Sequence, residues 1–186
     1  QYQSFEIIIV DNGSSDGTRK YLQNLEKEKS NVKVIYNKEN LGFAKANNQA
    51  AKIAKGDYLL LLNNDTEPQT GWLSKLVEIL DLDPSVCVVG SKLLFPDGKI
   101  QHAGVVYVEN RMKGGRLEAW HVDYKKEPKP ENALMREFQA LTAACLLVRK
   151  SSFDKAGGFD EAYWNGYEDV HLCATLQRDG GKCVYQ

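Results

Sequence analysis

The chain alternates between short apolar runs and longer segments whose apolar residues recur at helical spacing. The apolar runs predict buried strands, and they lie at residues 5–10, 32–36, 59–62 and 86–90. The intervening segments predict amphipathic helices, which we expect near residues 16–29, 43–54 and 71–82. Strands and helices that alternate with short links are typical of a doubly wound α/β fold with a mostly parallel sheet.

The second half of the chain is less regular. Residues 92–95 and 105–108, with the turn Pro96-Asp97-Gly98 between them, predict a small antiparallel hairpin insertion. From Glu109 to Arg136 the pattern dissolves into charges, glycines and prolines, so we expect a long mobile loop of the kind that often carries function. Four further elements follow: strands at residues 141–148 and 182–185, and helices at residues 150–156 and 167–178.

One apolar run ends abruptly in polar residues. Leu59-Leu60-Leu61-Leu62 is followed at once by Asn63-Asn64-Asp65-Thr66. Open α/β sheets bind their ligands at the carboxyl ends of such strands. Asn63 and Asp65 offer hard oxygen ligands, which suit Mg²⁺ or Mn²⁺ carrying a substrate's phosphates. Asn, Asp and Thr are also common turn residues, so this segment alone leaves a plain turn as an equal alternative.

A second carboxylate occupies the same position relative to a strand. Asp11 follows the apolar run at residues 5–10 and opens a loop rich in turn residues. If the strands that end at Asp11 and Asp65 are parallel neighbours, or nearly so, both carboxylates emerge at one edge of the sheet. Asp11 can then accept hydrogen bonds from a nucleobase or ribose while Asp65 holds a metal. This pairing favours a binding site over a turn.

Glu168 and Asp169 open the last predicted helix. Adjacent helix residues point about 100° apart, so only one of the two can aim squarely into a given site. A carboxylate in the first turn is stabilised in its ionised form, and it is a competent general base for a sugar hydroxyl. Simple charge complementarity at the helix N-terminus is the alternative. The preceding aromatic residues, Tyr163, Trp164 and Tyr167, either stack on a sugar or pack in the core.

The composition limits the function classes. Apolar residues make up 42% of the chain and charged residues 26%, with a formal net charge of −1, so a globular chain without a nucleic-acid footprint is expected. No apolar run approaches the roughly 20 residues that cross a bilayer. The four cysteines form no C-x-x-C pair, which predicts free thiols in a reducing, cytosolic compartment. His102, His121 and His171 show no metal-ligand spacing, and we expect them to be surface or structural residues.

Familiar nucleotide and hydrolase motifs are absent from the sequence. The chain contains no G-x-G-x-x-G after the first strand, no G-x-x-x-x-G-K-[ST], no G-x-S-x-G and no H-E-x-x-H. Dinucleotide-binding domains of the common type, P-loop NTPases, α/β-hydrolases and zincins are therefore not supported.

Four stretches occur in one order along the chain: EIIIVDNGSSDGT, NKENLGFAKANNQA, GDYLLLLNNDTEP and ACLLVRKSSFDKAGGFDEAYWNGYEDVHLC. Each is a weak motif by itself, and the four in this order are highly specific. The chain resembles the family 2 glycosyltransferases, especially the rhamnosyltransferase-like bacterial branch that builds cell-surface polysaccharide. The resemblance covers about Phe5 to Tyr185.

The resemblance implies a GT-A fold, with a Rossmann-like, mostly parallel sheet, flanking helices and a small antiparallel hairpin insertion. It implies an inverting, metal-dependent glycosyltransferase that moves a hexosyl or rhamnosyl group from a nucleoside-diphosphate sugar to a saccharide or lipid-linked acceptor. The implied cofactor is Mg²⁺ or Mn²⁺. The implied location is cytoplasmic, at the inner face of the membrane if segments missing from this chain bind there peripherally.

The resemblance also assigns roles to single residues. Asp169 matches the general base of the family's E-D motif, with Glu168 as the neighbouring site residue. Asp65 stands at the end of the family's D-x-D motif and is implied to be the principal metal ligand, because Asn63 replaces the first aspartate. The implied nucleotide side consists of Asp11, Asn40, Gly42, Asn47 and Asn64.

The chain departs from the family pattern at its ends. The family's first strand is missing before Gln1, and so is the stretch after the final strand, so we expect residues 1–186 to be a single-domain fragment with little transfer by itself. A DGxIQHAG-like stretch, with Asp97, Gln101 and His102, has no assigned role.

Two other functions remain open from the sequence. One is a non-catalytic nucleotide-sugar binding module or a lobe of a larger synthase. The other is a nucleotidyltransferase on a similar sheet. Asp169 discriminates the first of these, because a domain that only binds does not need a general base.

Overall fold

The computed structural model describes residues 4–186, apart from the side chain of Lys113. Its α-helices are α1 (Thr18–Glu28), α2 (Phe43–Ile53), α3 (Trp72–Leu82), α4 (Lys150–Lys155) and α5 (Glu168–Arg178). The strands before the insertion are β1 (Ile7–Asp11), β2 (Val32–Tyr36), β3 (Tyr58–Leu62) and β4 (Val86–Gly90). The remaining strands are β5 (Leu93–Leu94), β6 (Ile100–His102), β7 (Val105–Asn110), β8 (Arg116–His121), β9 (Arg136–Glu137), β10 (Cys145–Arg149) and β11 (Lys182–Tyr185). Two short 3₁₀ helices, η1 (Arg111–Lys113) and η2 (Pro130–Ala133), complete the described elements.

The largest sheet has five strands in the order β3-β10-β4-β11-β9. β4 and β11 are parallel, whereas β10 runs antiparallel to both β3 and β4. The predicted α/β class with flanking helices and small antiparallel hairpins is confirmed. The insertion of β10 makes the central sheet mixed, because a strand's own sequence encodes its burial and not its direction.

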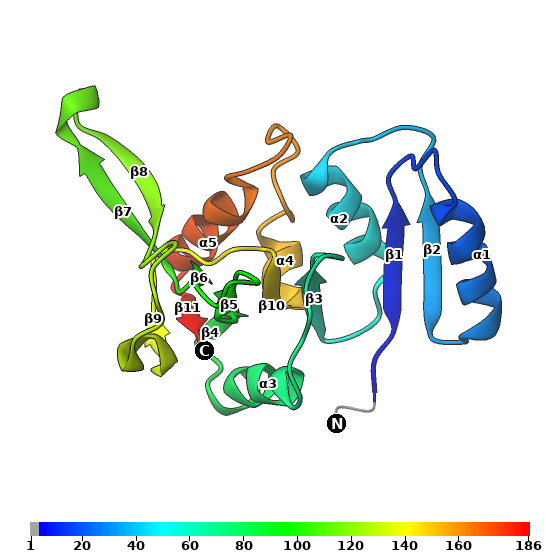
Figure 1. Ribbon diagram of the computed structural model, residues 1–186, viewed down its shortest axis with the longest axis horizontal. Helices are drawn as coiled ribbons and strands as arrows, with labels where there is room; N and C mark the ends of the chain where they lie inside the picture. The colour runs from blue at the N-terminus through cyan, green and yellow to red at the C-terminus, as the bar shows by residue number, and fades with distance from the viewer. Residues whose placement is uncertain (1–3) are drawn as a thin grey trace.

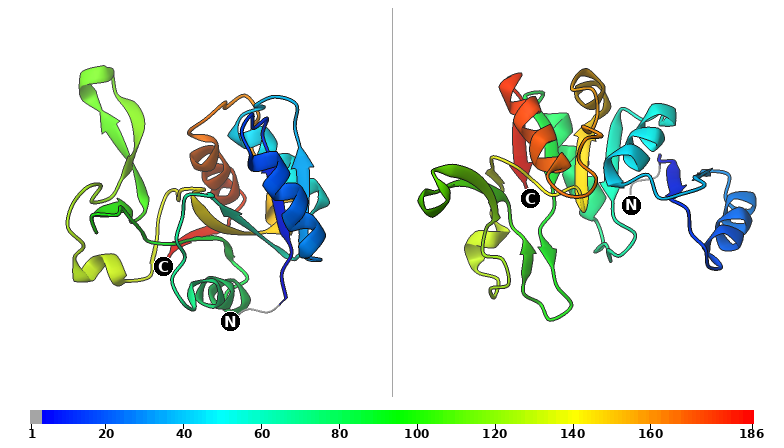
Figure 2. Two further views of the ribbon diagram at one scale, coloured as in Figure 1. Left: turned by 45° about the vertical axis from the view of Figure 1, so that its right-hand side comes forward. Right: turned by 90° about the horizontal axis from the view of Figure 1, so that it is seen from above.

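The β1–β2 pair stands beside this sheet with α1, as Figures 1 and 2 show. β1 pairs with β2 in parallel over its whole length, and no strand ladder joins β1 to β3 within residues 4–186. The strands that end near Asp11 and Asp65 are therefore not hydrogen-bonded neighbours, contrary to the simplest expectation. Helix α2 packs against β1 and lies between β1 and β3 in Figure 1.

Both faces of the central sheet are buried. Along β10, Leu146 and Val148 belong to a core cluster that includes residues of α2, α4 and α5. Cys145 and Leu147 belong to a second cluster, which includes residues of α3. This alternation explains the continuous apolar run in the sequence: a strand covered by helices on both faces has no solvent side on which to place polar residues.

The segment from Glu109 to Arg136 is more regular than its composition predicts. β7 and β8 form an antiparallel hairpin from Val105 opposite His121 to Asn110 opposite Arg116, and it projects from the body of the protein (Figure 1). Gly114 and Gly115 lie in its turn with φ of 74° and 77°. The expected long loop was wrong here because an exposed ribbon carries charges on both faces and shows no apolar alternation.

The other hairpin differs from the prediction in its partners. Leu93 and Leu94 pair with the β6 strand, not with residues 105–108. The turn at Asp97 and Gly98 closes this short hairpin as expected. Asp97 accepts the backbone N–H of Lys99 at 3.0 Å, and Gly98 has a φ of 85°, which suits glycine.

All four cysteines are free, as predicted, and three of them are buried. Within residues 4–186, every helix is too short or too polar to cross a lipid bilayer.

Candidate active site

Asp11 forms the first corner of the candidate site, at the carboxyl end of β1. The residue is buried, at 3% exposure, and its carboxylate accepts the backbone N–H of Ser14 at 2.9 Å. The Arg19 guanidinium donates through Nε at 3.3 Å. Hydrogen bonding from Ser14, with the charge of Arg19 added, holds the pKa of Asp11 below its usual value despite burial. Asp11 is therefore an ionised, fixed hydrogen-bond acceptor.

A network of side-chain amides holds the loops around Asp11. Asn12 donates to Asn40 at 2.8 Å and to the carbonyl of Gly42 at 3.3 Å, and it accepts the N–H of Leu41 at 3.0 Å. Gly13 lies against this second loop with a φ of 88°. An added Cβ there would meet the backbone of Glu39 at 2.7 Å. Two of the predicted nucleotide-side residues, Asn40 and Gly42, are thus placed next to the Asp11 loop.

The second corner is the turn after β3. The N–H of Asn63 donates to the carbonyl of Ala144 at 3.0 Å, and Thr66 bonds back to the carbonyl of Asn63 through its hydroxyl at 2.7 Å. The backbone of this segment does form a turn, as one of the two interpretations of the sequence predicted. That turn leaves Asp65 exposed, with no hydrogen bond or ion pair to any of residues 4–186. The turn and the ligand interpretations are compatible.

The turn after β3 offers few oxygen donors to a divalent cation. Asp65 supplies one free carboxylate, and Asn63 and Asn64 supply amide oxygens. No group of three or more His, Cys, Asp or Glu side chains within the described part of the chain could hold a metal ion. A sparse set of this kind fits Mg²⁺ or Mn²⁺ that keeps water and substrate phosphate as its other ligands.

The third corner is the start of α5. The Asp169 carboxylate accepts the N–H of Ala143 at 3.0 Å through Oδ2 and the N–H of Val170 at 2.8 Å through Oδ1. Glu168 is buried at 5% exposure, and its Oε2 has no hydrogen-bond partner among the described residues. As predicted for neighbours on a helix, the two carboxylates lie in different environments. Asp169 is half-buried and oriented, whereas Glu168 is enclosed.

Backbone hydrogen bonds connect the three corners. Ala143 and Ala144 are consecutive: one donates to Asp169, and the other accepts from Asn63. At the opposite side, the N–H of Phe43 donates to the carbonyl of Trp164 at 3.1 Å, and a Cβ on Gly42 would meet the same carbonyl at 2.8 Å. The loop before α5 thus touches the loop that surrounds Asp11. Figure 1 shows this loop beside the start of α2.

The aromatic residues before α5 are mostly exposed. Trp164 is 63% exposed and Tyr167 is 57% exposed, so core packing is excluded as their role. Tyr167 also has a φ of 71°, an unusual conformation for a residue other than glycine. Tyr163 is less exposed and lies with its ring centroid 5.6 Å from that of His171. Trp164 and Tyr167 are free to stack on a ligand next to Asp169.

Two predicted nucleotide-side residues gain little support from their contacts. Asn47 donates to the carbonyl of Phe43, one turn earlier in its own helix, at 2.9 Å. Asn64 is exposed in the turn after β3. Their proposed roles remain predictions.

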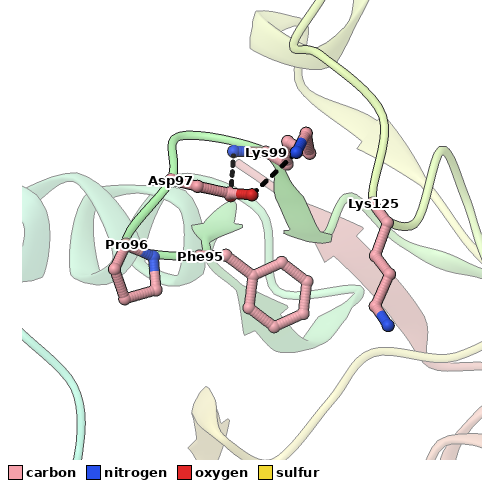
Figure 3. A pocket seen from close by; sticks show the side chains of 5 residues that line it. All are labelled: Phe95, Pro96, Asp97, Lys99 and Lys125. Carbon is pink, nitrogen blue, oxygen red and sulfur yellow. Dashed lines mark hydrogen bonds and ion pairs between the residues drawn. The ribbon is translucent and has the colours of Figure 1, made fainter.

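The unassigned stretch around Asp97 lies at a separate surface hollow of about 520 Å³. Phe95, Pro96, Asp97, Lys99 and Lys125 line it. Figure 3 shows Asp97 joined to Lys99, with an Nζ to Oδ2 distance of 2.8 Å, and Lys125 reaching in from another segment. None of the three corner carboxylates lines this hollow.

Sequence reasoning missed Asn48, which anchors the loop before α5. Asn48 is 7% exposed, and its amide bonds to both backbone groups of Phe159, donating at 2.8 Å and accepting at 2.9 Å. It also donates to Glu161 at 3.2 Å. A polar residue within the Ala-rich face of α2 was the available signal, because a buried amide requires a partner.

Replacing Asn48 with alanine is expected to lower the free energy of unfolding by about 2 kcal/mol, because it leaves both backbone groups of Phe159 without their partner. Denaturant unfolding measures this loss. Asn47→Ala is the matched control and should change stability far less, since its amide bonds only within its own helix. Equal effects of the two substitutions would contradict the anchoring role.

Burial raises the pKa of Glu168 above 4.5, and the neighbouring Asp169 charge adds to this rise. Below the unfolded pKa, Glu168 is protonated in both states and costs nothing. As pH rises, the unfolded chain ionises first, and the fold loses stability until Glu168 ionises as well. Glu168→Gln should therefore stabilise the protein by about 1 kcal/mol at neutral pH and by almost nothing near pH 4.

Thermal unfolding at the two pH values tests this prediction for Glu168. The control is Glu78→Gln on α3, at an exposed position where neither side chain is buried. A stabilisation of equal size at both pH values would mean that the buried charge is not its cause.

Comparison with known sequences shows the family of the chain. Residues 1–157 match the family described as glycosyl transferase family 2. The chain is 34% identical over 190 residues to the uncharacterized protein y4gI of Sinorhizobium fredii, covering 99% of this chain and 20% of that protein. It is 34% identical over 185 residues to the O-antigen biosynthesis protein RfbC of Myxococcus xanthus, covering 99% of this chain and 14% of that protein.

A third relative is the N-acetylglucosaminyl-diphospho-decaprenol L-rhamnosyltransferase of Mycobacterium tuberculosis. It is 27% identical over 199 residues, which cover 96% of this chain and 63% of that enzyme. The chain thus spans less than two thirds of the length of each of these relatives.

Solved structures agree on the fold. GalNAc-T7, crystallised with UDP, GalNAc and Mn²⁺, matches with a TM-score of 0.73 at 18% identity over 97% of this chain and 36% of that one. The mannosyltransferase PcManGT from Pyrobaculum calidifontis, in complex with GDP-Man and Mn²⁺, matches with a TM-score of 0.67 at 18% identity over 97% of this chain and 45% of that one. These likenesses show the GT-A fold, and the family match shows that the chain belongs to glycosyl transferase family 2.

Proposed function

We propose that the chain carries the catalytic site of an inverting glycosyltransferase that uses a nucleoside-diphosphate sugar. The observation that carries this proposal is a backbone connection between the candidate general base and the candidate metal-binding turn. Ala143 orients the candidate base Asp169, while the adjacent Ala144 fixes Asn63, which begins the turn that presents Asp65. The backbone of these two alanines thus links the proposed base to the turn that would hold the diphosphate. Fixed positions for the base and the leaving group suit a single displacement.

In this mechanism the residues of the chain have separate roles. Asp11, ionised and fixed, accepts hydrogen bonds from the nucleoside. Asp169 takes the proton from an acceptor hydroxyl, and that oxygen attacks the anomeric carbon from the face opposite the leaving diphosphate. One displacement inverts the configuration at the anomeric carbon. Trp164 and Tyr167 provide faces on which a sugar ring can stack beside Asp169.

Asp65, with Asn63, would hold a divalent cation. When bound there, it would supply positive charge that neutralises the diphosphate. Two structural neighbours are complexes with Mn²⁺, which supports a cation of this class without distinguishing Mn²⁺ from Mg²⁺.

The relatives narrow the acceptor class. One has a name in O-antigen biosynthesis, and another has the name of a rhamnosyltransferase acting on a sugar linked through diphosphate to decaprenol. We therefore propose a saccharide or lipid-linked acceptor in surface polysaccharide synthesis, and rhamnosyl or hexosyl as the transferred group. Four free cysteines fit a cytoplasmic setting for this reaction.

Thermal unfolding with UDP, GDP, dTDP and ADP, each with and without Mn²⁺, tests the proposal. A diphosphate at about 100 times its Kd should stabilise the fold by about 2.7 kcal/mol, and only with the metal. A response to no diphosphate would count against a nucleotide-sugar site. Stabilisation equal with and without Mn²⁺ would remove Asp65 from its proposed role.

A further inference from the structure

The stretch IQHAG has a buried histidine that the proposed reaction does not use. His102, at the end of β6, is fully buried, and its Nδ1 lies 3.1 Å from Nδ1 of His121. The two rings meet edge to face, with centroids 5.2 Å apart. Burial lowers the pKa of His102 to about 3, so His102 is neutral at working pH. A contact between two Nδ1 atoms then requires that one of them donates its proton to the other.

The surroundings of His102 decide which ring donates. Its second nitrogen, Nε2, is buried and has no partner among the described residues. A proton on Nε2 would bury an unpaired N–H donor, which proteins rarely do. His102 therefore carries its proton on Nδ1, and this N–H donates a hydrogen bond to Nδ1 of His121. The neutral His121 then carries its own proton on Nε2, at the other edge of a ring whose residue is exposed.

The base of the β7–β8 hairpin connects His121 to the segment that leads to Ala143. Val105 pairs with His121 on one side and with Ala140 on the other, so the three residues form one row across neighbouring strands. Ala140 lies three residues before Ala143, which donates to Asp169. Burial lowers the pKa of His121, and the negative charge of Asp169 acts in the opposite direction and raises it. The two side chains therefore lie within electrostatic reach of each other.

We propose that His121 is an acceptor-binding residue, which donates its Nε2–H to an oxygen of the acceptor sugar beside the hydroxyl that Asp169 deprotonates. His102 is a positioning residue that fixes the ring and the tautomer of His121. The proton of the reacting hydroxyl goes to Asp169, and His121 keeps its own. The inference rests on the proposed function, because it identifies the acceptor side of the same site.

Ring-nitrogen NMR of the ¹⁵N-labelled protein between about pH 5 and 8 tests the geometry without any activity. His102 should stay neutral with its proton on Nδ1. The groups that face His121 are His102, Tyr124 and Asp169. Asp169→Asn should therefore lower the pKa of His121, and Asp65→Asn should not change it. A proton on Nε2 of His102, or no effect of Asp169→Asn, would overturn the proposal.

Octyl glycosides of N-acetylglucosamine, glucose and galactose are the probes for acceptor binding. At saturating concentration, with a nucleoside diphosphate and Mn²⁺ present, at least one should shift the Nε2 signal of His121. His121→Ala should weaken that glycoside's binding about tenfold, which is one hydrogen bond's share of affinity. His121→Gln, which keeps an N–H near Nε2, should recover part of it. His171→Ala, which alters the exposed histidine on α5, is the control and should bind like the parent.

The outcomes separate this inference from the proposed function. Binding of a nucleoside diphosphate, with no shift of His121 by any glycoside, rejects the role of His121 and keeps the transferase. Failure of every diphosphate to bind rejects the proposed function, while the tautomer of His102 still reports on the histidine pair.

Discussion

Replacing Asp169 with asparagine is expected to slow sugar transfer by about 10³-fold, within the range attributed to a general base. Asparagine has nearly the same shape and can still accept the N–H of Ala143 through its Oδ1, but its Nδ2 cannot accept the N–H of Val170 as the second carboxylate oxygen does. What is lost is the ability to take a proton from the acceptor. Affinity for the nucleoside diphosphate should not change.

Initial transfer rates and calorimetric titration of the diphosphate measure the two effects separately. The matched control is Asp179→Asn at the other end of the same helix, where the carboxylate pairs with Lys155 at 3.0 Å on the surface. That variant should transfer like the parent chain. Turnover retained by Asp169→Asn would exclude Asp169 as the base.

Replacing Asp65 with asparagine is expected to remove the metal-dependent part of diphosphate binding and to slow transfer by about 10²-fold or more. Asp65 is the one carboxylate among residues 63–66, so its loss leaves only neutral oxygens in that turn. A neutral amide attracts a divalent cation far less than a carboxylate does. Folding should be unaffected, because Asp65 is exposed and unpaired within residues 4–186.

The measurement is the Mn²⁺ concentration that gives half of the diphosphate-induced stabilisation. Asp57→Asn, at the opposite end of the same strand, is the control and should leave that concentration unchanged. An unchanged Mn²⁺ response in Asp65→Asn would place the cation elsewhere.

The sequence determined the elements and the chemistry available at their ends. Continuous apolar runs at β3 and β4 and amphipathic spacing at α2 and α3 are local patterns, and the structure forms these elements close to the predicted boundaries. The positions of Asp11 and Asp65 after strands follow from the same patterns. So does the place of Asp169 in the first turn of α5.

Only the tertiary structure decided which of these ends meet. The join between Asn63 and Asp169 passes through Ala143 and Ala144, which have no distinctive side chains and bond through their backbone. Asn48 holds a loop 111 residues away. His102 and His121 meet because β6 and the end of β8 are brought together. The spacing of apolar residues along a segment indicates which of its faces is buried. Strand partners, strand direction and buried polar pairs depend instead on contacts between segments that are distant in the sequence.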